Sequence, residues 1–472
     1  MTDSSPEKTP VVPRQYLFAF ALVTSLFALW GFANDVTNPL VKVFKEVFLL
    51  SNEKSAWVQR AFYGGYATMA IPAALIIRKF SYKSGIITGL VLYAIGALMF
   101  IPASMGMSYW LFLIACYVLT FGLAFLETAA NPYILSMGPA ETATRRLNLA
   151  QAFNPVGSLI GMLVMSQLIL TNLDVDKFRQ EQKDAHPEYL EMLPSQVDEK
   201  VTEALKDYSV DEPEAHQAMQ SHDLKVVRIP YVAIAMVVLV VLAVFAIAKM
   251  PDTGHEEDPI HILELLGRLA SFRYLGGVVA QTFYVGAQIM CWTFIIHYGV
   301  TLLNMETATA QKWNIAAMVT FLVGRWLGTV FLLKRVPAGK ALGILAVGGF
   351  AATAAAIFTP GIPGIVCVVA ISLFMSLMFP TIYGLALDGL TPNDAKLGSA
   401  GLIFAIVGGA LMPPWQAGII DAGPIQLGGF TLEAVRASFL LPLGCFVVVA
   451  LYGFLVSRSN ATQYGAASNP SA

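Results

Sequence analysis

Two stretches of sequence decide the fold: residues 74–80 read ALIIRKF, and residues 330–336 read VFLLKRV. Each stretch ends a long apolar segment with a pair of basic residues, and one more lysine, Lys83 or Lys340, follows each pair. The two stretches also occupy matching places in the two halves of the chain. The sequence therefore predicts two related groups of helices that cross a membrane.

The composition of the chain supports this interpretation. Of its 472 residues, 56% are hydrophobic and 13% are charged, whereas a soluble domain carries about 25% charged residues. The mean hydropathy of +0.65 excludes an ordinary soluble enzyme. A formal net charge of −2 provides no basic excess for binding nucleic acid. The four cysteines lie far apart inside apolar segments, and we expect them to be packing residues.

Twelve apolar segments are long enough to cross a membrane as helices. They are residues 16–37, 55–77, 84–104, 109–134, 147–169, 228–249, 274–298, 311–333, 341–360, 364–388, 397–419 and 434–456. Twelve spans place the tails, residues 1–15 and 458–472, on one side. Basic residues near the span ends are concentrated on that side, so we expect both termini in the cytoplasm. The predicted fold class is an all-α membrane protein with twelve transmembrane helices in two six-helix bundles.

Two connections between the spans are long. Residues 172–224 are rich in Asp and Glu and predict an extracytoplasmic insertion, helical around residues 195–208, that is either a lid or receptor surface or a solvated insertion. The cytoplasmic linker, residues 251–273, holds an amphipathic helix over residues 260–269. It separates an N-terminal bundle, residues 16–250, from a C-terminal bundle, residues 274–457. Parallel repeats of six spans are the arrangement of major facilitator transporters, with substrate held between the halves.

Two acidic residues lie inside the predicted spans: Asp35 near the end of the first and Glu127 well inside the fourth. A charge at the centre of a membrane helix costs at least ~2.5–3.5 kcal/mol, so each is a functional candidate. Burial favours the neutral carboxyl group, which can take up and release a proton as its access to water alternates. We therefore expect proton coupling at Glu127 and Asp35. The alternatives are a structural acid held by hydrogen bonds and, for Asp35, a cap near the outer interface.

Two further charged residues are candidates for gating. Arg325 lies near the middle of the eighth span. Its side chain could pair with a carboxylate across the bundle, but we favour one that extends to the cytoplasmic interface, about two turns away. Asp388 ends the tenth span on the cytoplasmic side, where it would serve as a gating or capping residue.

Amide and aromatic side chains occur in the pattern that a sugar site needs. A sugar presents hydroxyl groups and an apolar face, which suit amides and flat aromatic rings. Gln151 and Asn154 lie three residues apart in the fifth span, and one face of the seventh carries Gln281, Tyr284, Gln288 and Trp292. The alternative role of each is a hydrogen bond between helices. The sequence has neither a P-loop nor a zinc-binding helix, so we expect no enzyme activity, no metal and no cofactor.

Five runs of residues resemble the fucose:proton symporter family of the major facilitator superfamily. They are LWGFAN at 29–34, AFYGGY at 61–66, LETAANP at 126–132, RLNLAQAFN at 146–154 and YVGAQ at 284–288. The resemblance covers nearly all the spans and is weakest in the acidic insertion. It implies a monomeric, multi-pass protein surrounded by lipids of the bacterial inner membrane. Such a protein imports a monosaccharide, typically L-fucose, together with a proton by alternating access.

The resemblance also implies roles for single residues. Glu127 matches the family's protonatable acid in the fourth span. Gln151 and Asn154 match amides that contact the sugar, and Phe379 precedes the proline of the tenth span. We add three neighbouring amides to the expected sugar site: Asn34, Asn38 and Asn131.

One position departs from the family pattern. The family's first-span acid aligns with Asn38, whereas this chain has its acid at Asp35, one helical turn earlier on the same face. This departure leaves the sugar open, with galactose, glucose and N-acetylglucosamine as alternatives to L-fucose. A sodium-coupled or facilitative carrier on the same fold is a second alternative, and a sugar sensor without transport is a third.

Overall fold

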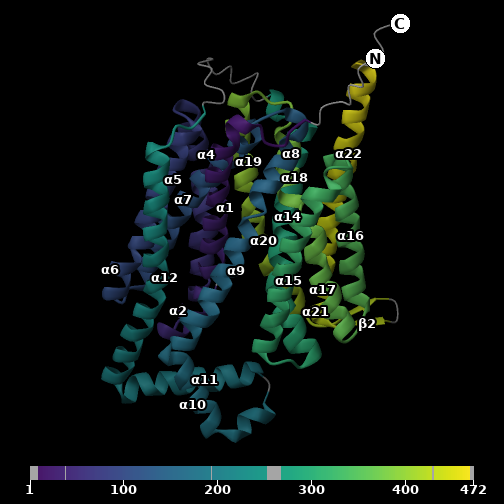
Figure 1. The fold of residues 1–472 in the computed structure, drawn as a ribbon. Helices are drawn as coiled ribbons and strands as arrows, with labels where there is room; N and C mark the ends of the chain where they lie inside the picture. Colours follow the sequence, from purple (N-terminus) through teal and green to yellow (C-terminus); the bar gives the residue numbers. More distant parts are fainter. Residues whose placement is uncertain (1–8, 38, 193, 252–266, 428–429, 468–472) are drawn as a thin grey trace.

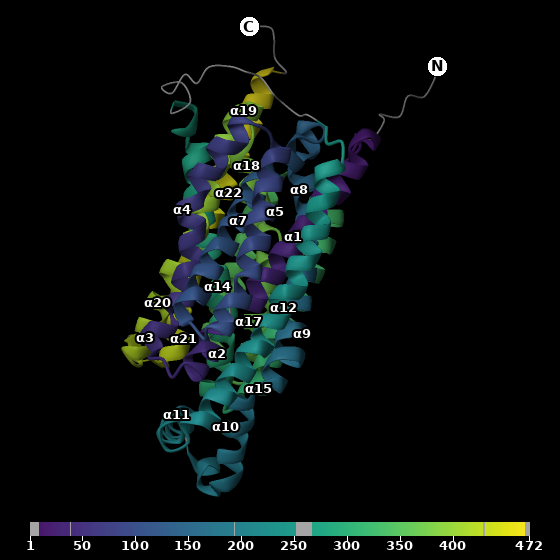
Figure 2. The same ribbon diagram turned by 90° about the vertical axis from the view of Figure 1, so that its left-hand side faces the viewer.

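The apolar segments fold into long helices that run side by side between two ends of the molecule (Figure 1). The computed structural model describes residues 9–37, 39–192, 194–251, 267–427 and 430–467. Helix α1 (Leu17–Thr37) begins at one end of the molecule, and α22 (Leu440–Ala467) ends at the same end. We call it the terminal end. Helices α10 (Asp174–Ala185) and α11 (Pro194–Asp211) lie at the opposite end, the insertion end (Figure 2).

The remaining helices fall into a first half, before residue 250, and a second half, after residue 272. The first half contains α2 (Leu40–Val47), α3 (Asn52–Ser55), α4 (Trp57–Lys79), α5 (Tyr82–Leu98), α6 (Phe100–Met105), α7 (Tyr109–Ser136), α8 (Ala143–Gln151), α9 (Asn154–Val164) and α12 (Pro213–Ile247). The second half contains α14 (Phe272–His297), α15 (Thr307–Leu327), α16 (Ala338–Phe358), α17 (Ile362–Met375), α18 (Met378–Leu387), α19 (Pro392–Phe404), α20 (Gly408–Asp421) and α21 (Ala434–Ser438).

Each of the twelve predicted spans overlaps one or two of these helices. Among the described residues, eleven segments are long and apolar enough to cross a membrane. Helix α4, at the second predicted span, is not one of the eleven, because Gln59, Arg60 and the basic pair at its end lower its hydropathy. It nevertheless packs inside the bundle against α7 and α19.

Several boundaries differ from the sequence-based expectation. Helix α12 begins at Pro213 rather than at residue 228, because the polar end of the insertion continues the same helix. The helix expected around residues 195–208 is α11. An unexpected hairpin joins β1 (Ile425–Leu427) to antiparallel β2 (Phe430–Leu432), with Ile425 paired to Leu432. The amphipathic run expected at 260–269 lies largely outside the described residues, so the division into two bundles around it stays a prediction.

Two spans at matching positions in the two halves are interrupted. The fifth span consists of α8 and α9, which are separated by residues 152–153. The eleventh consists of α19 and α20, with a 3₁₀ turn, Ala405–Val407, between them. Such breaks leave backbone groups without partners in their own helix. In transporters built from repeats, interrupted helices at matching positions indicate the substrate site.

Glycines allow each interrupted span to lie very close to a neighbouring helix. Helix α1 packs against α9, and α14 packs in the same way against α20. A Cβ atom on Gly157 of α9 would overlap the carbonyl oxygen of Ala28. A Cβ atom on Gly408 of α20 would overlap the carbonyl oxygen of Thr282 in α14. Each half is therefore held together by backbone contacts that leave no room for a side chain.

We predict that Gly157→Ala destabilises the protein by about 1–3 kcal/mol, because the added methyl group forces α1 and α9 apart. Thermal unfolding of the purified protein in detergent would measure the effect. Gly444→Ala is the matched control, since a Cβ atom at Gly444 meets nothing within 4 Å. The close-packing argument is wrong if the two substitutions change the unfolding temperature equally.

Candidate functional site

The buried acid Glu127 is held by hydrogen bonds from two neighbouring helices. Its side chain is 3% exposed and lies in α7. The hydroxyl group of Tyr66, from α4, donates to Glu127 Oε1 over 3.3 Å. Trp30 Nε1, from α1, donates in turn to the Tyr66 hydroxyl oxygen. Three helices of the first half thus meet at this carboxyl group.

A second group of hydrogen bonds begins one helical turn after Glu127 and crosses into the second half. Asn131 Nδ2 donates to the backbone oxygen of Glu127 at 3.1 Å, and Asn131 Oδ1 accepts from Gln151 Nε2 at 2.7 Å. The backbone oxygen of Gln151, at the end of α8, accepts from Arg325 Nη1 at 3.1 Å. Arg325 Nε also donates to the backbone oxygen of Ser376, which lies between α17 and α18.

The expectation that Arg325 extends to the cytoplasmic interface is wrong. Its side chain is 2% exposed, and its guanidinium group lies 4.4 Å from the centre of the Phe321 ring. The side chain turns inward because two helix breaks, at residues 152–153 and 376–377, present carbonyl groups that need donors. Its hydrogen bonds in the structure are to those carbonyl groups and not to a carboxylate.

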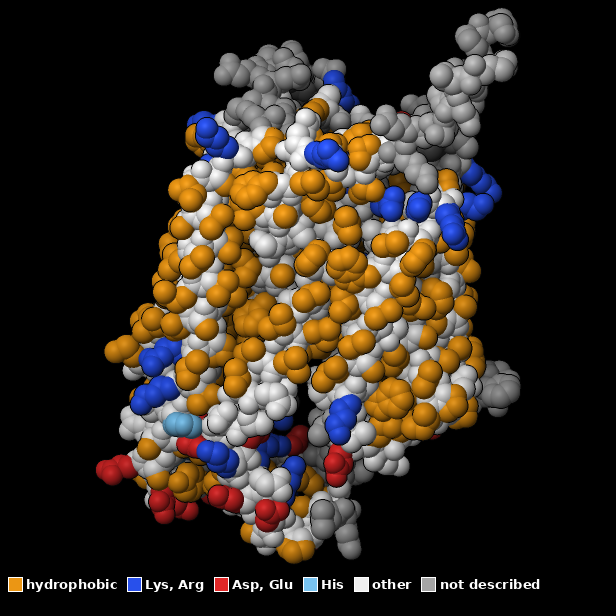
Figure 3. All heavy atoms as spheres, in the orientation of Figure 1, with side chains coloured by type: hydrophobic (Ala, Val, Ile, Leu, Met, Phe, Trp, Pro, Cys, Tyr) orange, Lys and Arg blue, Asp and Glu red, His pale blue; other side chains and the backbone are white. Residues whose placement is uncertain are grey.

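Other hydrogen bonds between the halves lie toward the terminal end. Asn148 Nδ2 donates to Thr381 Oγ1 at 3.2 Å. Ser399 Oγ donates to the backbone oxygen of Thr128 at 3.2 Å. Arg145 Nε donates to the backbone oxygen of Thr329 at 3.3 Å. The halves therefore meet closely on this side of Glu127. Lys and Arg side chains lie at both ends of the face shown in Figure 3, whereas Asp and Glu side chains gather at the insertion end.

The halves separate toward the insertion end. A groove of about 480 Å³ lies there between the two, with α2 on one side and α14 on the other. Its lining residues are Pro39, Val41, Lys42, Lys45, Ser55, Thr293, Ile296 and His297. Figure 3 shows a hollow between the halves at this end. The molecule is thus closed toward the terminal end and open toward the insertion end.

Asp35, the second predicted acid, does not share the hydrogen bonds of Glu127. It lies near the end of α1 and is partly buried. Ser158 of α9, whose hydroxyl group donates to the backbone oxygen of Gly31 at 3.5 Å, and Tyr63 of α4 are both close enough to interact with its carboxyl group. Asn34 beside it is also partly buried. Asn38 lies outside the described residues.

The predicted amides of the fifth span have different surroundings. Gln151 is engaged with Asn131, as described above. Asn154 Nδ2 donates to the backbone oxygen of Phe27 in α1 at 3.3 Å, and its side chain is 8% exposed. Both amides therefore lie at the break between α8 and α9.

The four predicted residues of α14 divide into two kinds. Tyr284 donates to the Met375 oxygen at 3.0 Å, and Trp292 Nε1 donates to Ser372 Oγ at 3.2 Å, so both bind α14 to α17. Gln281 is completely buried, and both its Nε2 and its Oε1 lack a hydrogen-bond partner. A buried amide without partners is costly unless something else binds it. Gln288 is partly buried.

The aromatic and acidic candidates of α18 lie at different depths. Phe379 is 7% exposed and packs edge-on against Tyr284, with ring centres 6.3 Å apart. Asp388 lies at the terminal end and pairs with Arg273 Nη1 at 2.8 Å. This ion pair connects the end of α18 to the first turn of α14.

Three residues that the sequence analysis did not single out belong to this region. Tyr66 binds Glu127 directly, and Tyr383 of α18 is close enough to Glu127 to interact electrostatically. Ser158 is close enough to Asp35 to interact with it. A usable signal existed for the tyrosines, because a hydroxyl group inside an apolar span must find a partner there.

One group of possible metal ligands occurs among the described residues: Asp174, His222 and Asp223, whose ligand atoms lie within 4.8 Å of one another. The Asp223 carboxylate accepts from the backbone nitrogens of Asp174 and Val175, at 2.6 and 3.0 Å. Lys177 Nζ donates a hydrogen bond to Asp174 Oδ1 at 2.8 Å. These contacts cap the start of α10, and nothing else at this position indicates a metal ion.

Comparison with known sequences places the chain among sugar transporters. The family description "Major Facilitator Superfamily" matches residues 19–175. An L-fucose-proton symporter of Haemophilus influenzae is 49% identical over 446 residues, covering 94% of this chain and 97% of the relative. An L-fucose-proton symporter of Escherichia coli K12 is 34% identical, covering 94% of each chain. A glucose/galactose transporter of Brucella abortus is 32% identical, covering 97% and 100%.

A solved structure has the same fold. The crystal structure of the major facilitator transporter FucP in the outward conformation superposes with a TM-score of 0.77 and 33% identity, covering 94% of this chain and 99% of that one. The chain belongs to the fucose:proton symporter and glucose/galactose transporter family of the major facilitator superfamily.

Proposed function

We propose that this protein imports a monosaccharide, L-fucose, by symport with a proton. The observation that carries the proposal is Glu127, a carboxyl group buried near the contact between the halves and held only by neutral donors, Tyr66 and indirectly Trp30. Without a cation to balance it, the charged form is strongly disfavoured, so the stable form here is protonated. L-fucose is the sugar of the relative with 49% identity.

The structure corresponds to a state in which the site is open toward the insertion end. Hydrogen bonds between the halves are concentrated toward the terminal end, whereas a groove separates α2 from α14 at the insertion end. Rocking the halves about the region near Glu127 would close the groove and open the terminal end, as in other transporters built from repeats.

The orientation follows from the charges. The short connections at the terminal end carry the basic pairs at 78–79, 145–146 and 334–335, so by the positive-inside rule we place this end in the cytoplasm. The open groove then faces outward, in the direction from which an imported sugar arrives. The bacterial relatives support the inner membrane as the location. We propose a monomer, since each chain contains both halves.

The sugar would bind between the halves, close to the interrupted spans. Gln281 offers a free donor and a free acceptor, and Asn154 adds an amide at the break of the fifth span. Phe379 supplies a flat apolar surface. Protonated Glu127 leaves the site without a net charge, which favours the binding of a neutral sugar and its movement across the bundle. Loss of the proton to the cytoplasm follows sugar release.

The remaining candidate residues have further roles in this proposal. We propose Asp35 as a second proton site and Arg325 as a gating residue that stabilises closure toward the terminal end through Gln151 and Ser376. Asp388 is the second proposed gating residue, and it holds α18 to α14 through Arg273. Glucose or galactose is the second candidate substrate, because a relative with 32% identity is a glucose/galactose transporter. Uptake of labelled L-fucose into proteoliposomes, with galactose, glucose and N-acetylglucosamine as competitors, tests the assignment.

We predict that Glu127→Gln abolishes accumulation of sugar driven by a proton gradient but preserves exchange of sugar across the membrane. Glutamine imitates the protonated acid and still accepts from Tyr66, so the site survives while the proton cycle does not. Both activities would be measured in proteoliposomes. Glu141→Gln, an exposed acid at the terminal end, is the control and should keep full accumulation. Gradient-driven accumulation by Glu127→Gln would refute the assignment.

We predict that Gln281→Leu raises KM for the sugar roughly tenfold, equal to about 1.4 kcal/mol, because two hydrogen bonds to the sugar are lost. The fold should not be weakened, since Gln281 has no protein partner to lose. Gln416→Leu is the matched comparison: Gln416 Nε2 donates to Ser438 Oγ at 3.1 Å, so this change should lower thermal stability. A stability loss in Gln281→Leu with an unchanged KM would show that Gln281 is structural.

A further inference from the structure

The insertion is a folded element and not a solvated loop. We call residues 174–211, which contain α10 and α11, the cap. Apolar residues of both helices are buried in it: Val175, Val197, Val201 and Leu205. The rings of Phe178 and Tyr208 pack between the helices with centres 5.1 Å apart. Asp223 of α12 caps the first turn of α10.

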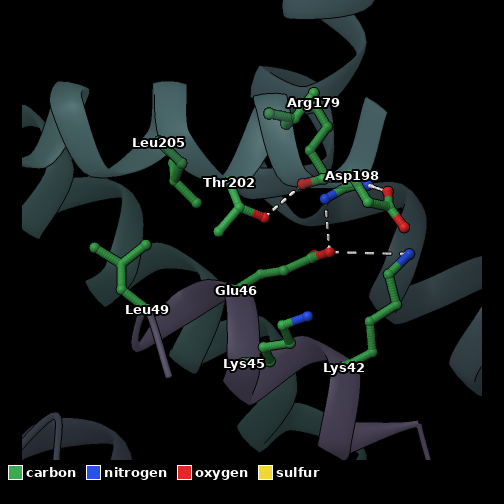
Figure 4. A pocket seen from close by; sticks show the side chains of 9 residues that line it. Lys42, Lys45, Glu46, Leu49, Arg179, Asp198, Thr202 and Leu205 are labelled. Atoms are coloured by element: carbon green, nitrogen blue, oxygen red, sulfur yellow. Dashed lines mark hydrogen bonds and ion pairs between the residues drawn. The ribbon is translucent and has the colours of Figure 1, made fainter. Parts of the chain in front are cut away.

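A buried ion pair fastens the cap to α2. Arg179 Nη1 of α10 donates to Glu46 Oε1 of α2 at 2.9 Å, and each of the two side chains is 9% exposed. Arg179 Nη2 also binds Asp198 of α11, so one guanidinium group joins all three helices (Figure 4). Removing Arg179 leaves the buried Glu46 carboxylate only the exposed Lys42 ammonium group, at 4.0 Å, which is a weaker partner.

Helix α2 is the wall between the cap and the entrance of the transporter. A cavity of about 140 Å³ lies between α2 and the cap, and the groove between the two halves lies on the other side of α2. Lys42 and Lys45 line both. Residues 38 and 39 alone separate α2 from α1, the helix that carries Asp35. A shift of α2 would therefore change the width of the entrance and the position of the end of α1.

We propose that Arg179 is a positioning residue for transport: by tying the cap to Glu46, it fixes α2 at the mouth of the groove and so sets the width of the entrance. The cap then belongs to the first half and moves with it as the halves rock. Gln220 of α12, which donates to the Val47 oxygen at 2.9 Å, holds the far end of α2. Arg179 holds the side of α2 that faces the cap.

The first test measures the entrance without any sugar. Thr293→Cys places a reporter thiol on the exposed second-half wall of the groove. We expect Arg179→Met to raise its rate of labelling by a membrane-impermeant maleimide ~3-fold or more, because α2 is no longer held. Hydrogen exchange of residues 174–211 should rise in the same variant. Lys200→Met, which removes an exposed ion pair with Glu203 in the cap, is the control and should change neither quantity.

The second test measures transport and rests on the proposed function. Arg179→Met should raise KM for sugar uptake ~3-fold or more and change kcat less, because it alters access and not the proton site. The double variant Glu46→Gln/Arg179→Met lacks the same tie and should match Arg179→Met in KM and in labelling rate, because the two changes remove one interaction. Glu46→Gln alone breaks the same ion pair by changing α2 instead of the cap. If Arg179→Met does not fold, Glu46→Gln is the variant to test.

Two results would overturn the inference. One is faster hydrogen exchange in the cap with an unchanged labelling rate at Thr293→Cys, which would mean that the cap detaches without moving α2. The other is a double variant whose impairment is the sum of those of Arg179→Met and Glu46→Gln, which would mean that Arg179 acts through something other than Glu46. A wild-type protein that takes up none of the four sugars would contradict the proposed function instead, and the labelling experiment would still decide the role of the cap.

Discussion

Polar groups inside a bundle of apolar helices have no water to bind, so they must find partners in the protein or in a ligand. This constraint organises the centre of the molecule. The break at residues 152–153 frees the carbonyl group of Gln151, and the break at 376–377 frees that of Ser376. Arg325 satisfies both. The Glu127 carboxyl group is satisfied by Tyr66 in the same way. Where the protein provides no partner, as at Gln281, a ligand is the remaining source.

The same constraint explains why the halves can separate. Within each half, glycines bring backbones into direct contact, as Gly157 does with Ala28 and Gly408 with Thr282. Between the halves, the contacts toward the terminal end are hydrogen bonds such as Asn148 to Thr381 and Ser399 to Thr128. Each contributes only about 0.5–1.5 kcal/mol net. Rigid halves that meet through helix packing and individually weak hydrogen bonds can rock against each other without unfolding.

Hydropathy and charge were enough to predict much of this structure. Spans follow from apolar length, and the importance of Glu127 follows from the cost of a charge in such a span. The direction of the Arg325 side chain could not be predicted, because the nearest interface is visible in the sequence but the carbonyl groups at two helix breaks are not. The pairing of Glu46 with Arg179 joins residues 133 positions apart and depends on how α10 packs on α2. Local patterns carry no information on such a contact.

The two halves have interrupted helices at corresponding positions, but their buried polar side chains differ. Both candidate proton sites, Asp35 and Glu127, lie in the first half, whereas the buried amide without partners, Gln281, lies in the second. In the proposed mechanism, the proton site of the first half and the sugar held between the halves are coupled through the surface where the halves meet. Arg325 lies on that surface and is bound to both sides of it. Coupling in this chain is therefore a property of the interface, and the symmetry of the helices serves to let that interface open at either end.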